Sequence, residues 1–407
     1  MLKFITTVFP AVVVSTYPDH VDHSKISFWK DELSHVSTTG YIPISKSSET
    51  FYWLFSSNNN PLSVPTIVWL QGQIGVSSLF GAVHEFTPAW LGDFNVLFVD
   101  GPVGTGFSIT TSEDEYATTS EQIASQLYHF LNLFFDRHAD DIGSRIILAG
   151  EDYAGHTIPV LAALIVHNQD SYSRFRLVGT AVGNGHTHAP IQVITKAESA
   201  AFFGLIDGAC ITEARKHAWS ASVKSVAGDA SGSLEERNAL EQTILNCSPG
   251  IDMSNIGHFT SETKPNDLMV ELDNWMNDSS LRKVLGMKSD SPLSAKNQTV
   301  FNALKPDIMR VIWQYIPPIL EANIPMLWYQ GQLDWVDGVF SNEAWINALE
   351  WSGAEEYATR SRVSWSGGYK RSFGPLTEAM VLNTGHLAIR EKPNEILSLF
   401  KATFGQS

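Results

Sequence analysis

The most constraining feature of this chain is a series of short, continuously apolar segments, each ending in glycine or another turn residue. Longer stretches with a helical pattern, such as 120–135, lie between them. Strands buried on both faces of a parallel sheet have this continuous apolar character, and alternation with helices indicates a doubly wound sheet. The sequence therefore predicts an α/β fold with a mostly parallel central sheet. The predicted strands are 51–55, 66–72, 95–101, 145–150, 177–185, 325–331 and 378–385.

One region interrupts this alternation. Residues 207–300 are polar and helix-prone, and they carry both cysteines and all three Asn-x-Ser/Thr sites. We interpret the region as a helical insertion that caps the carboxyl edge of the sheet, where open α/β sheets bind their ligands. The predicted organisation is a signal peptide at 1–16, a first core segment at 17–206, the cap at 207–300 and a second core segment at 301–407.

Charge and hydropathy exclude several classes of protein. The 407 residues carry a net charge of −16, whereas a nucleic-acid-binding protein would show a basic face. Lys3 precedes an apolar run from Phe4 to about Val14, which is typical of a secretory signal peptide and too short to span a bilayer. A buried first strand is the alternative interpretation of this run. No later segment has the roughly 20 apolar residues of a membrane helix, so no membrane association is expected.

The cysteines and the glycosylation motifs fit a secreted chain. Cys210 and Cys247 can form one disulfide in an oxidising compartment, and their spacing matches no zinc pattern. Asn246, Asn277 and Asn297 each begin an Asn-x-Ser/Thr acceptor site for N-linked glycans. We expect a secreted protein or one delivered to a lysosome or vacuole.

Three predicted strand ends carry reactive side chains. Asp152 follows the strand at 145–150, Asp334 follows the strand at 325–331, and His386 follows the segment VLNTG. The chain order of nucleophile, acid and histidine is that of the α/β-hydrolase triad. Small residues flank Asp152 in the segment GEDYAG, as a sharp strand-to-helix turn requires, because a bulky side chain would clash with the neighbouring backbone.

Six blocks in the same order resemble the serine carboxypeptidase family, over about residues 27–405. WLQGQIGVSS resembles the family's W-L-N-G-G-P-G-C-S-S, and GEDYAGHTIP resembles G-E-S-Y-A-G-x-Y-I-P. The retinoid-inducible branch is the most similar, because it also carries G-Q-L-D. The other four blocks are NVLFVDGPVGTGFS, AVGNGHTHA, LWYQGQLDWV and NTGHLA.

The resemblance implies an α/β-hydrolase fold and release of C-terminal residues from peptides. It assigns Asp334 and His386 as the acid and the base of the triad, and the backbone amides of Gln73 and Tyr153 as the oxyanion hole. It implies neither cofactor nor metal. The His-x-His pair at 186–188 has no third potential metal ligand at a spacing typical of metal sites, so we interpret the pair as structural.

The resemblance also assigns a site for the substrate's terminal carboxylate. Glu151 and Gln71 would bind this group, with Gln71 in the place of an asparagine, and Glu85 would share a proton with Glu151. Two carboxyl groups in contact do not both ionise easily, so the pair keeps a proton into mildly acidic pH and can donate a hydrogen bond. The expected partner is a peptide or a peptide-like ligand. Known relatives include dimers and glycosylated monomers, so a homodimer remains open.

Departures from the family pattern fall on all parts of the predicted site. Asp152 stands where the family has its serine nucleophile, and Gln73 and Ile74 replace a glycine and the proline of the oxyanion loop. Gly101 replaces a glutamine, and Leu387 replaces a methionine. The resemblance to the family therefore predicts impaired catalysis.

Three functions remain open on the sequence. The first is a serine carboxypeptidase homologue that has lost peptidase chemistry and acts by binding. The second is a hydrolase that uses Asp152 as its nucleophile on epoxides, halides or similar carbons, as some α/β-hydrolases do. The third is an active peptidase in which aspartate at 152 is a variant. Trp69, Trp328 and Trp335 are interpreted as core or pocket wall rather than a halide site.

Overall fold

The computed structural model describes residues 37–168, 174–288 and 291–405. The predicted signal peptide at 1–16 lies outside the described residues. Among the described residues, no helix has the length and the apolar character needed to cross a membrane.

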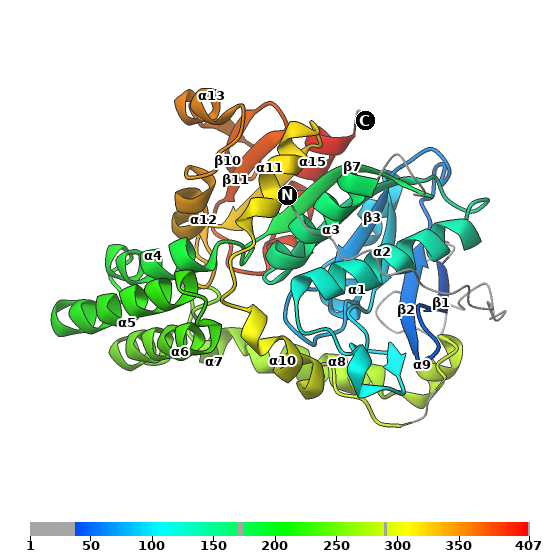
Figure 1. Ribbon diagram of the computed structural model, residues 1–407, viewed down its shortest axis with the longest axis horizontal. Coiled ribbons are helices and arrows are strands. Elements are labelled where there is room, and N and C mark those ends of the chain that lie inside the picture. The colour runs from blue at the N-terminus through cyan, green and yellow to red at the C-terminus, as the bar shows by residue number, and fades with distance from the viewer. Residues whose placement is uncertain (1–36, 169–173, 289–290, 406–407) are drawn as a thin grey trace.

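An eleven-stranded mixed sheet forms the centre of the protein (Figure 1). The strand order is β1-β2-β4-β3-β6-β7-β8-β11-β10-β9, and β5 pairs with β2. The six strands from β4 to β11 in this order run parallel, and antiparallel strands flank them on both sides. The strands are β1 (Ser37–Pro43), β2 (Ser48–Phe55), β3 (Thr66–Leu70), β4 (Asn95–Val99), β5 (Ile109–Thr110), β6 (Arg145–Glu151), β7 (Arg176–Gly183), β8 (Met326–Gly331), β9 (Val363–Trp365), β10 (Gly368–Phe373) and β11 (Leu376–Val381).

The predicted fold class is confirmed, and all seven predicted strands are present. They correspond to β2, β3, β4, β6, β7, β8 and β11. Four strands were not predicted, namely β1, β5, β9 and β10. These are short or lie toward the sheet edges, and β10 alternates between buried and exposed residues instead of forming an apolar run.

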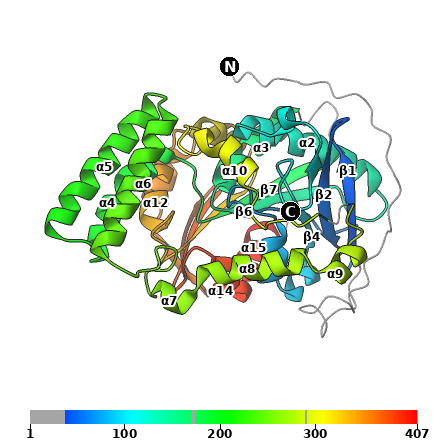
Figure 2. The same cartoon turned by 90° about the horizontal axis from the view of Figure 1, so that it is seen from below.

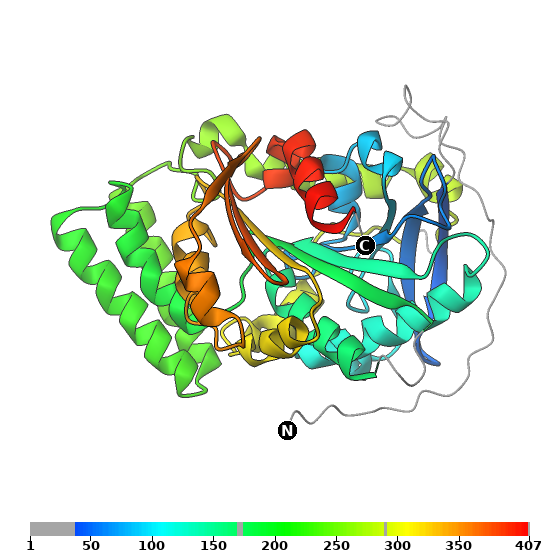
Figure 3. The same ribbon diagram turned by 90° about the horizontal axis from the view of Figure 1, so that it is seen from above.

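Helices cover both faces of the sheet (Figures 2 and 3). The helices are α1 (Leu79–His84), α2 (Ser120–Arg137), α3 (Ala154–Asn168), α4 (Ala189–Phe202), α5 (Gly208–Val226), α6 (Ala230–Cys247), α7 (Thr260–Thr263), α8 (Pro265–Met276), α9 (Ser279–Val284), α10 (Gln298–Leu304), α11 (Ile316–Glu321), α12 (Val339–Ile346), α13 (Ala354–Thr359), α14 (Ala388–Glu391) and α15 (Pro393–Phe404). One hydrophobic core packs α2, α3 and α11 against one face of the sheet. A second hydrophobic core packs α1, α8 and α15 against the opposite face. Burial of these apolar side chains is the main driving force for the layered fold.

Two groups of helices between β7 and β8 pack on different cores. α4, α5 and α6 project from one end of the sheet and share their own apolar core, which includes Ala197, Ala218 and Leu240 (Figure 1). The predicted boundary at residue 207 falls between α4 and α5. The apolar core of the helical unit also includes α4, which begins at Ala189. α8 and α9 instead pack on the core of the sheet body, through residues such as Leu272.

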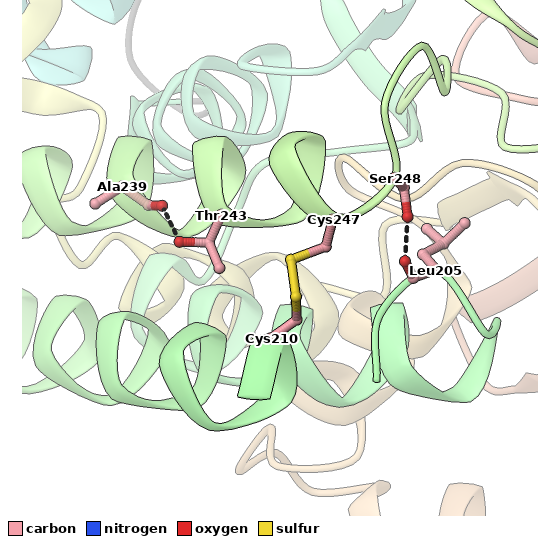
Figure 4. Close-up of a disulfide and its surroundings, with 6 residues drawn as sticks. All are labelled: Leu205, Cys210, Ala239, Thr243, Cys247 and Ser248. Carbon is pink, nitrogen blue, oxygen red and sulfur yellow. Dashed lines mark hydrogen bonds between the residues drawn. A yellow bond between two sulfur atoms is a disulfide. The ribbon is translucent and has the colours of Figure 1, made fainter. Parts of the chain in front are cut away.

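A disulfide between Cys210 and Cys247 joins the start of α5 to the end of α6 (Figure 4). The two cysteines are separated by 37 positions in the sequence, and their Cα atoms lie 6.5 Å apart. Ser248 follows Cys247 and donates a hydrogen bond from its hydroxyl to the carbonyl of Leu205. This end of the helical unit is therefore held by a disulfide and a hydrogen bond.

Replacing both Cys210 and Cys247 by alanine should destabilise the helical unit. A cross-link that closes a loop of this length stabilises by about 3 to 4 kcal/mol, mainly by restricting the unfolded chain. Hydrogen exchange should show faster exchange in α5 and α6 while the amides of β6 and β7 stay protected. Equal loss of protection in the sheet would contradict the independence of the two units.

Candidate active site

Asp152 lies on a sharp turn between β6 and α3. Its backbone has φ 54°, in the left-handed region that non-glycine residues rarely adopt. Its N–H donates to the carbonyl of Gly183 at 3.1 Å, and its carbonyl accepts from the N–H groups of Gly155 and His186 at 2.9 and 2.8 Å. A Cβ on Gly150 would lie 2.3 Å from the carbonyl oxygen of Leu70, so this position requires glycine. Tight packing therefore fixes Asp152 in the strained conformation of a nucleophile elbow.

Asp334 and His386 form a hydrogen-bonded pair at the ends of β8 and β11. His386 Nδ1 lies 2.9 Å from Asp334 Oδ2, and the Asp334 side chain is fully buried. Asn184 donates to Asp334 Oδ2 at 2.7 Å, and the N–H of Val336 donates to Asp334 Oδ1 at 2.7 Å. The backbone N–H of His386 donates to Ser254 at 2.7 Å. These bonds fix the orientation of the imidazole, as the acid of a catalytic triad does.

The three groups perturb one another electrostatically. Burial opposes the charged imidazolium, but the adjoining Asp334 carboxylate, followed by Asp152 and Glu151, raises the pKa of His386 to about 10. Burial raises the pKa of Asp152, and the positive charge of His386 opposes this shift. No hydrogen bond joins the side chains of Asp152 and His386 in the described part of the chain. These acidic neighbours favour the charged form of His386 and so oppose its action as a general base.

The backbone of the predicted oxyanion loop passes close to the elbow. A Cβ on Gly72 would overlap the carbonyl oxygen of Glu151 at 1.4 Å, so only glycine fits there. The N–H groups of Gln73 and Tyr153 have no hydrogen-bond acceptor among the described residues. Two backbone donors without acceptors beside residue 152 match the requirement for an oxyanion hole.

A buried carboxyl pair lies beside the elbow. Gln71 Nε2 donates to Glu151 Oε1 at 2.9 Å, and Trp69 Nε1 donates to Gln71 Oε1 at 3.2 Å. Glu85 and Glu151 are both 2% exposed, and their charges perturb each other, although neither oxygen of Glu85 has a hydrogen-bond partner among the described residues. Burial raises the pKa of Glu85 to about 7, and burial together with the charge of Glu85 raises the pKa of Glu151 well above its usual range. The pair therefore holds at least one proton at neutral pH.

Comparison with protein-family models identifies the family. Residues 29–406 match the family model for serine carboxypeptidase. The chain belongs to the serine carboxypeptidase family. Serine carboxypeptidase-like 50 of Arabidopsis thaliana is 29% identical over 382 residues, covering 87% of this chain and 84% of the relative. The venom serine carboxypeptidase of Apis mellifera is 28% identical over 401 residues, covering 89% and 83%.

A solved structure supports the same fold. The prohormone-processing carboxypeptidase Kex1Δp of Saccharomyces cerevisiae superimposes with a TM-score of 0.79 at 21% identity. The match covers 95% of this chain and 92% of the yeast chain. The α/β-hydrolase architecture predicted from the sequence is thereby confirmed.

The helical unit brings charged residues to the site that sequence analysis missed. Glu241 of α6 pairs with Arg237 at 3.0 Å and with Lys196 of α4 at 3.7 Å. Lys196 donates to the carbonyl of Val336, two residues after the triad acid position. The positive charge of Arg237 opposes the raised pKa of Asp152. Arg237 offsets part of the negative charge around Asp152, and Lys196 does so around Asp337 and Asp334. The helical segments of these two cations carry no motif that marks them.

Both histidines of the His-x-His pair have structural partners. His186 lies 3.3 Å from Asp337 and 2.7 Å from the carbonyl of Ile308. His188 accepts a hydrogen bond from the N–H of Ile191 and caps α4. The described residues contain no group of three or more His, Cys, Asp or Glu side chains suited to a metal ion.

The protonation state of His386 provides a direct test of this geometry. Imidazole NMR should show His386 still protonated at neutral pH. Asp334→Asn should lower its pKa the most, because the Asp334 contact is the strongest stabiliser of the imidazolium. Asp152→Ser should lower the pKa of His386 by less. A His386 that titrates near 6.5 in the unmodified chain would contradict the proposed charge cluster.

The same pKa shift predicts how stability depends on pH. The folded value of about 10 exceeds the ordinary value of 6.5, so this interaction stabilises fully below pH 6.5 and is lost as the pH rises through 10. Urea unfolding of the unmodified chain and of His386→Gln should therefore show a difference that shrinks across this range. A difference that stays constant from pH 6 to pH 10 would refute it.

Proposed function

We propose that this member of the serine carboxypeptidase family does not hydrolyse peptides and acts by binding a peptide-like ligand through its carboxyl pair. One observation carries the proposal: Asp152 occupies the elbow where the family has its serine, with a backbone φ of 54°. The site therefore lacks the hydroxyl nucleophile, and the carboxyl groups around His386 also disfavour the neutral form that would act as a base.

A carboxylate at residue 152 cannot replace serine in peptide hydrolysis. Serine attacks the peptide carbonyl after histidine removes its proton, and the product is an acyl ester. Attack by the Asp152 carboxylate would give a mixed anhydride, which the expelled amine would readily attack to re-form the peptide. Loss of a triad serine alone can cost on the order of 10⁶ in turnover.

The carboxyl pair supports binding of a terminal carboxylate. A protonated Glu85 or Glu151 can donate a hydrogen bond to an anionic ligand, and Gln71 holds the Glu151 oxygen in place. An ionised pair would instead repel the ligand. The release of C-terminal residues is the family activity, and this chain would retain only its recognition step.

A secretory or lysosomal location is part of the proposal. The disulfide between Cys210 and Cys247 favours an oxidising compartment. The predicted signal peptide and the three Asn-x-Ser/Thr sites favour the same route.

The purified chain should release no C-terminal amino acid from N-acyl dipeptides between pH 4.5 and pH 7. Asp152→Ser should also remain far below an active peptidase, because the oxyanion loop has lost its proline and one glycine. Product release can be followed by liquid chromatography. Steady release by the unmodified chain that disappears in His386→Ala would disprove the proposal. Full recovery in Asp152→Ser would confine the damage to the nucleophile.

Binding of a carboxylate-terminated dipeptide should weaken as the pH rises through about 7, because Glu85 then ionises. Glu85→Gln should flatten this dependence, since the amide keeps a hydrogen-bond donor without titrating. Calorimetry with the free acid and with the C-terminal amide of the same dipeptide provides the matched comparison. Equal pH dependence for both ligands would exclude the carboxyl pair as the binding group.

A second candidate function rests on the Asp152 carboxylate itself. Its oxygen could attack an epoxide carbon while the carbon–oxygen bond breaks, and His386 could donate its proton to the leaving oxygen. The product would be an ester on Asp152. Intact mass spectrometry after incubation with an aryl epoxide should then show one added molecule, absent in Asp152→Asn. Failure to find this adduct across a panel of epoxides and alkyl halides would eliminate this candidate.

A further inference from the structure

A short loop carries the acid of the triad. Residues 334–337, here called the acid loop, lie between β8 and α12. Within the loop, the N–H groups of Val336 and Asp337 donate to the Asp334 carboxylate at 2.7 and 3.2 Å. Two of the hydrogen bonds that Asp334 accepts therefore come from its own loop, and both depend on the orientation of the loop backbone.

A buried lysine of the helical unit contacts the acid loop. Lys196 lies on α4, is 1% exposed, and donates from Nζ to the carbonyl of Val336. The Nζ atom also lies 5.0 Å from the centre of the Trp335 ring, and Trp335 Nε1 donates to the carbonyl of Lys196 at 3.2 Å. Hydrogen bonds therefore join the lysine and the loop in both directions.

The peptide unit that joins Val336 to Asp337 connects these two sets of contacts. This unit is trans, so its C=O and its N–H point in opposite directions. Its C=O is bound by Lys196 and its N–H by Asp334 Oδ2, so the peptide plane cannot rotate without breaking one of these bonds. The link continues to His386, whose Nδ1 lies 2.9 Å from the same Oδ2 atom.

A second side chain of α4 supports the acid loop. Gln192 lies one helical turn before Lys196, on the same face of the helix. Its Nε2 donates to Asp337 Oδ1 at 3.1 Å and to the carbonyl of Gly185, just after β7, at 2.8 Å. Gln192 therefore holds a side chain of the loop, whereas Lys196 holds its backbone.

Packing alone does not account for a lysine at this position. A buried ammonium group loses its hydration, and it is retained where hydrogen bonds and opposite charges replace the water. Glu241 of α6 lies 3.7 Å from Lys196 Nζ. Burial lowers the pKa of Lys196, and the charges of Asp337 and Glu241 oppose this shift. An apolar side chain would fill the same space without the cost of burying a charge.

We propose that Lys196 is a positioning residue for the triad acid. It fixes the peptide unit that joins Val336 to Asp337, and this peptide unit in turn orients Asp334 toward His386. Through this lysine the helical unit sets the geometry of the acid–histidine pair. The role goes beyond the proposed binding function, because it holds whether or not a peptide-like ligand binds at the carboxyl pair.

Proton NMR of the full chain tests this role. A histidine Nδ1 proton that is bound to a buried carboxylate resonates far downfield of the backbone amides, and its loss in His386→Gln assigns the signal. Lys196→Met keeps the apolar stem and removes the donor, so the downfield resonance should disappear or move toward the amide region. An unchanged resonance in a folded Lys196→Met chain would overturn the proposal.

Two control variants separate positioning from the general integrity of the helical unit. Lys224 of α5 pairs with Glu236 at 2.8 Å, so Lys224→Met also removes a lysine–glutamate pair of this unit. Glu241→Gln removes the acidic partner of Lys196 and keeps the donor to the acid loop. Both variants should retain the downfield resonance. Its loss in either one would show that the signal reports the whole helical unit, which would refute the positioning role.

A second substitution covers the case in which Lys196→Met does not fold. Lys196→Gln keeps a polar group at this buried position, but its side chain is one atom shorter and no longer reaches the Val336 carbonyl. Near-ultraviolet circular dichroism verifies folding, and the downfield resonance should again be lost. A crystal structure of the variant should show a rotated peptide unit in the acid loop and an Asp334–His386 distance longer than 2.9 Å. An unmoved peptide unit would contradict the proposal.

Discussion

The close approach of β6, α3 and the neighbouring strand ends is the constraint on which the site depends. Residue 152 must adopt a left-handed backbone conformation because its N–H and carbonyl are bound to Gly183, Gly155 and His186. The surrounding backbone imposes this conformation on residue 152 whatever the chemistry of its side chain. The geometry of the elbow is therefore retained, although aspartate replaces the serine that the family has at this position.

Replacing serine by aspartate removes the hydroxyl group that the histidine would deprotonate and adds a carboxyl group beside the histidine. In an active triad the histidine alternates between neutral and charged forms. Here two carboxylates flank His386 and stabilise only the charged form. Arg237 of the helical unit offsets part of the added negative charge, which helps the fold to accommodate Asp152. The carboxyl pair lies beside this cluster and keeps its own proton.

Strands buried on both faces were predictable because their apolar runs are continuous, as in the segment that became β6. The edge strands were not, because a half-exposed strand such as β10 mixes polar and apolar residues. The triad positions were predictable because Asp152, Asp334 and His386 each follow such a strand within a short motif. The positions of Lys196 and Arg237 at the site were not predictable, because the sequence contains many other charged residues in helices that simply face solvent.

The sequence by itself determined the seven strands with apolar runs, the positions of the elbow and the triad residues, and the substitution at 152. These features depend on local patterns, which short segments specify. Only the tertiary structure decided that acidic neighbours raise the pKa of His386, that Glu85 and Glu151 are buried side by side, and that a buried lysine of the helical unit contacts the loop of the triad acid. Those properties depend on burial and on distances between residues far apart in the chain, because electrostatic and hydrogen-bond energies are set by what surrounds a group in space.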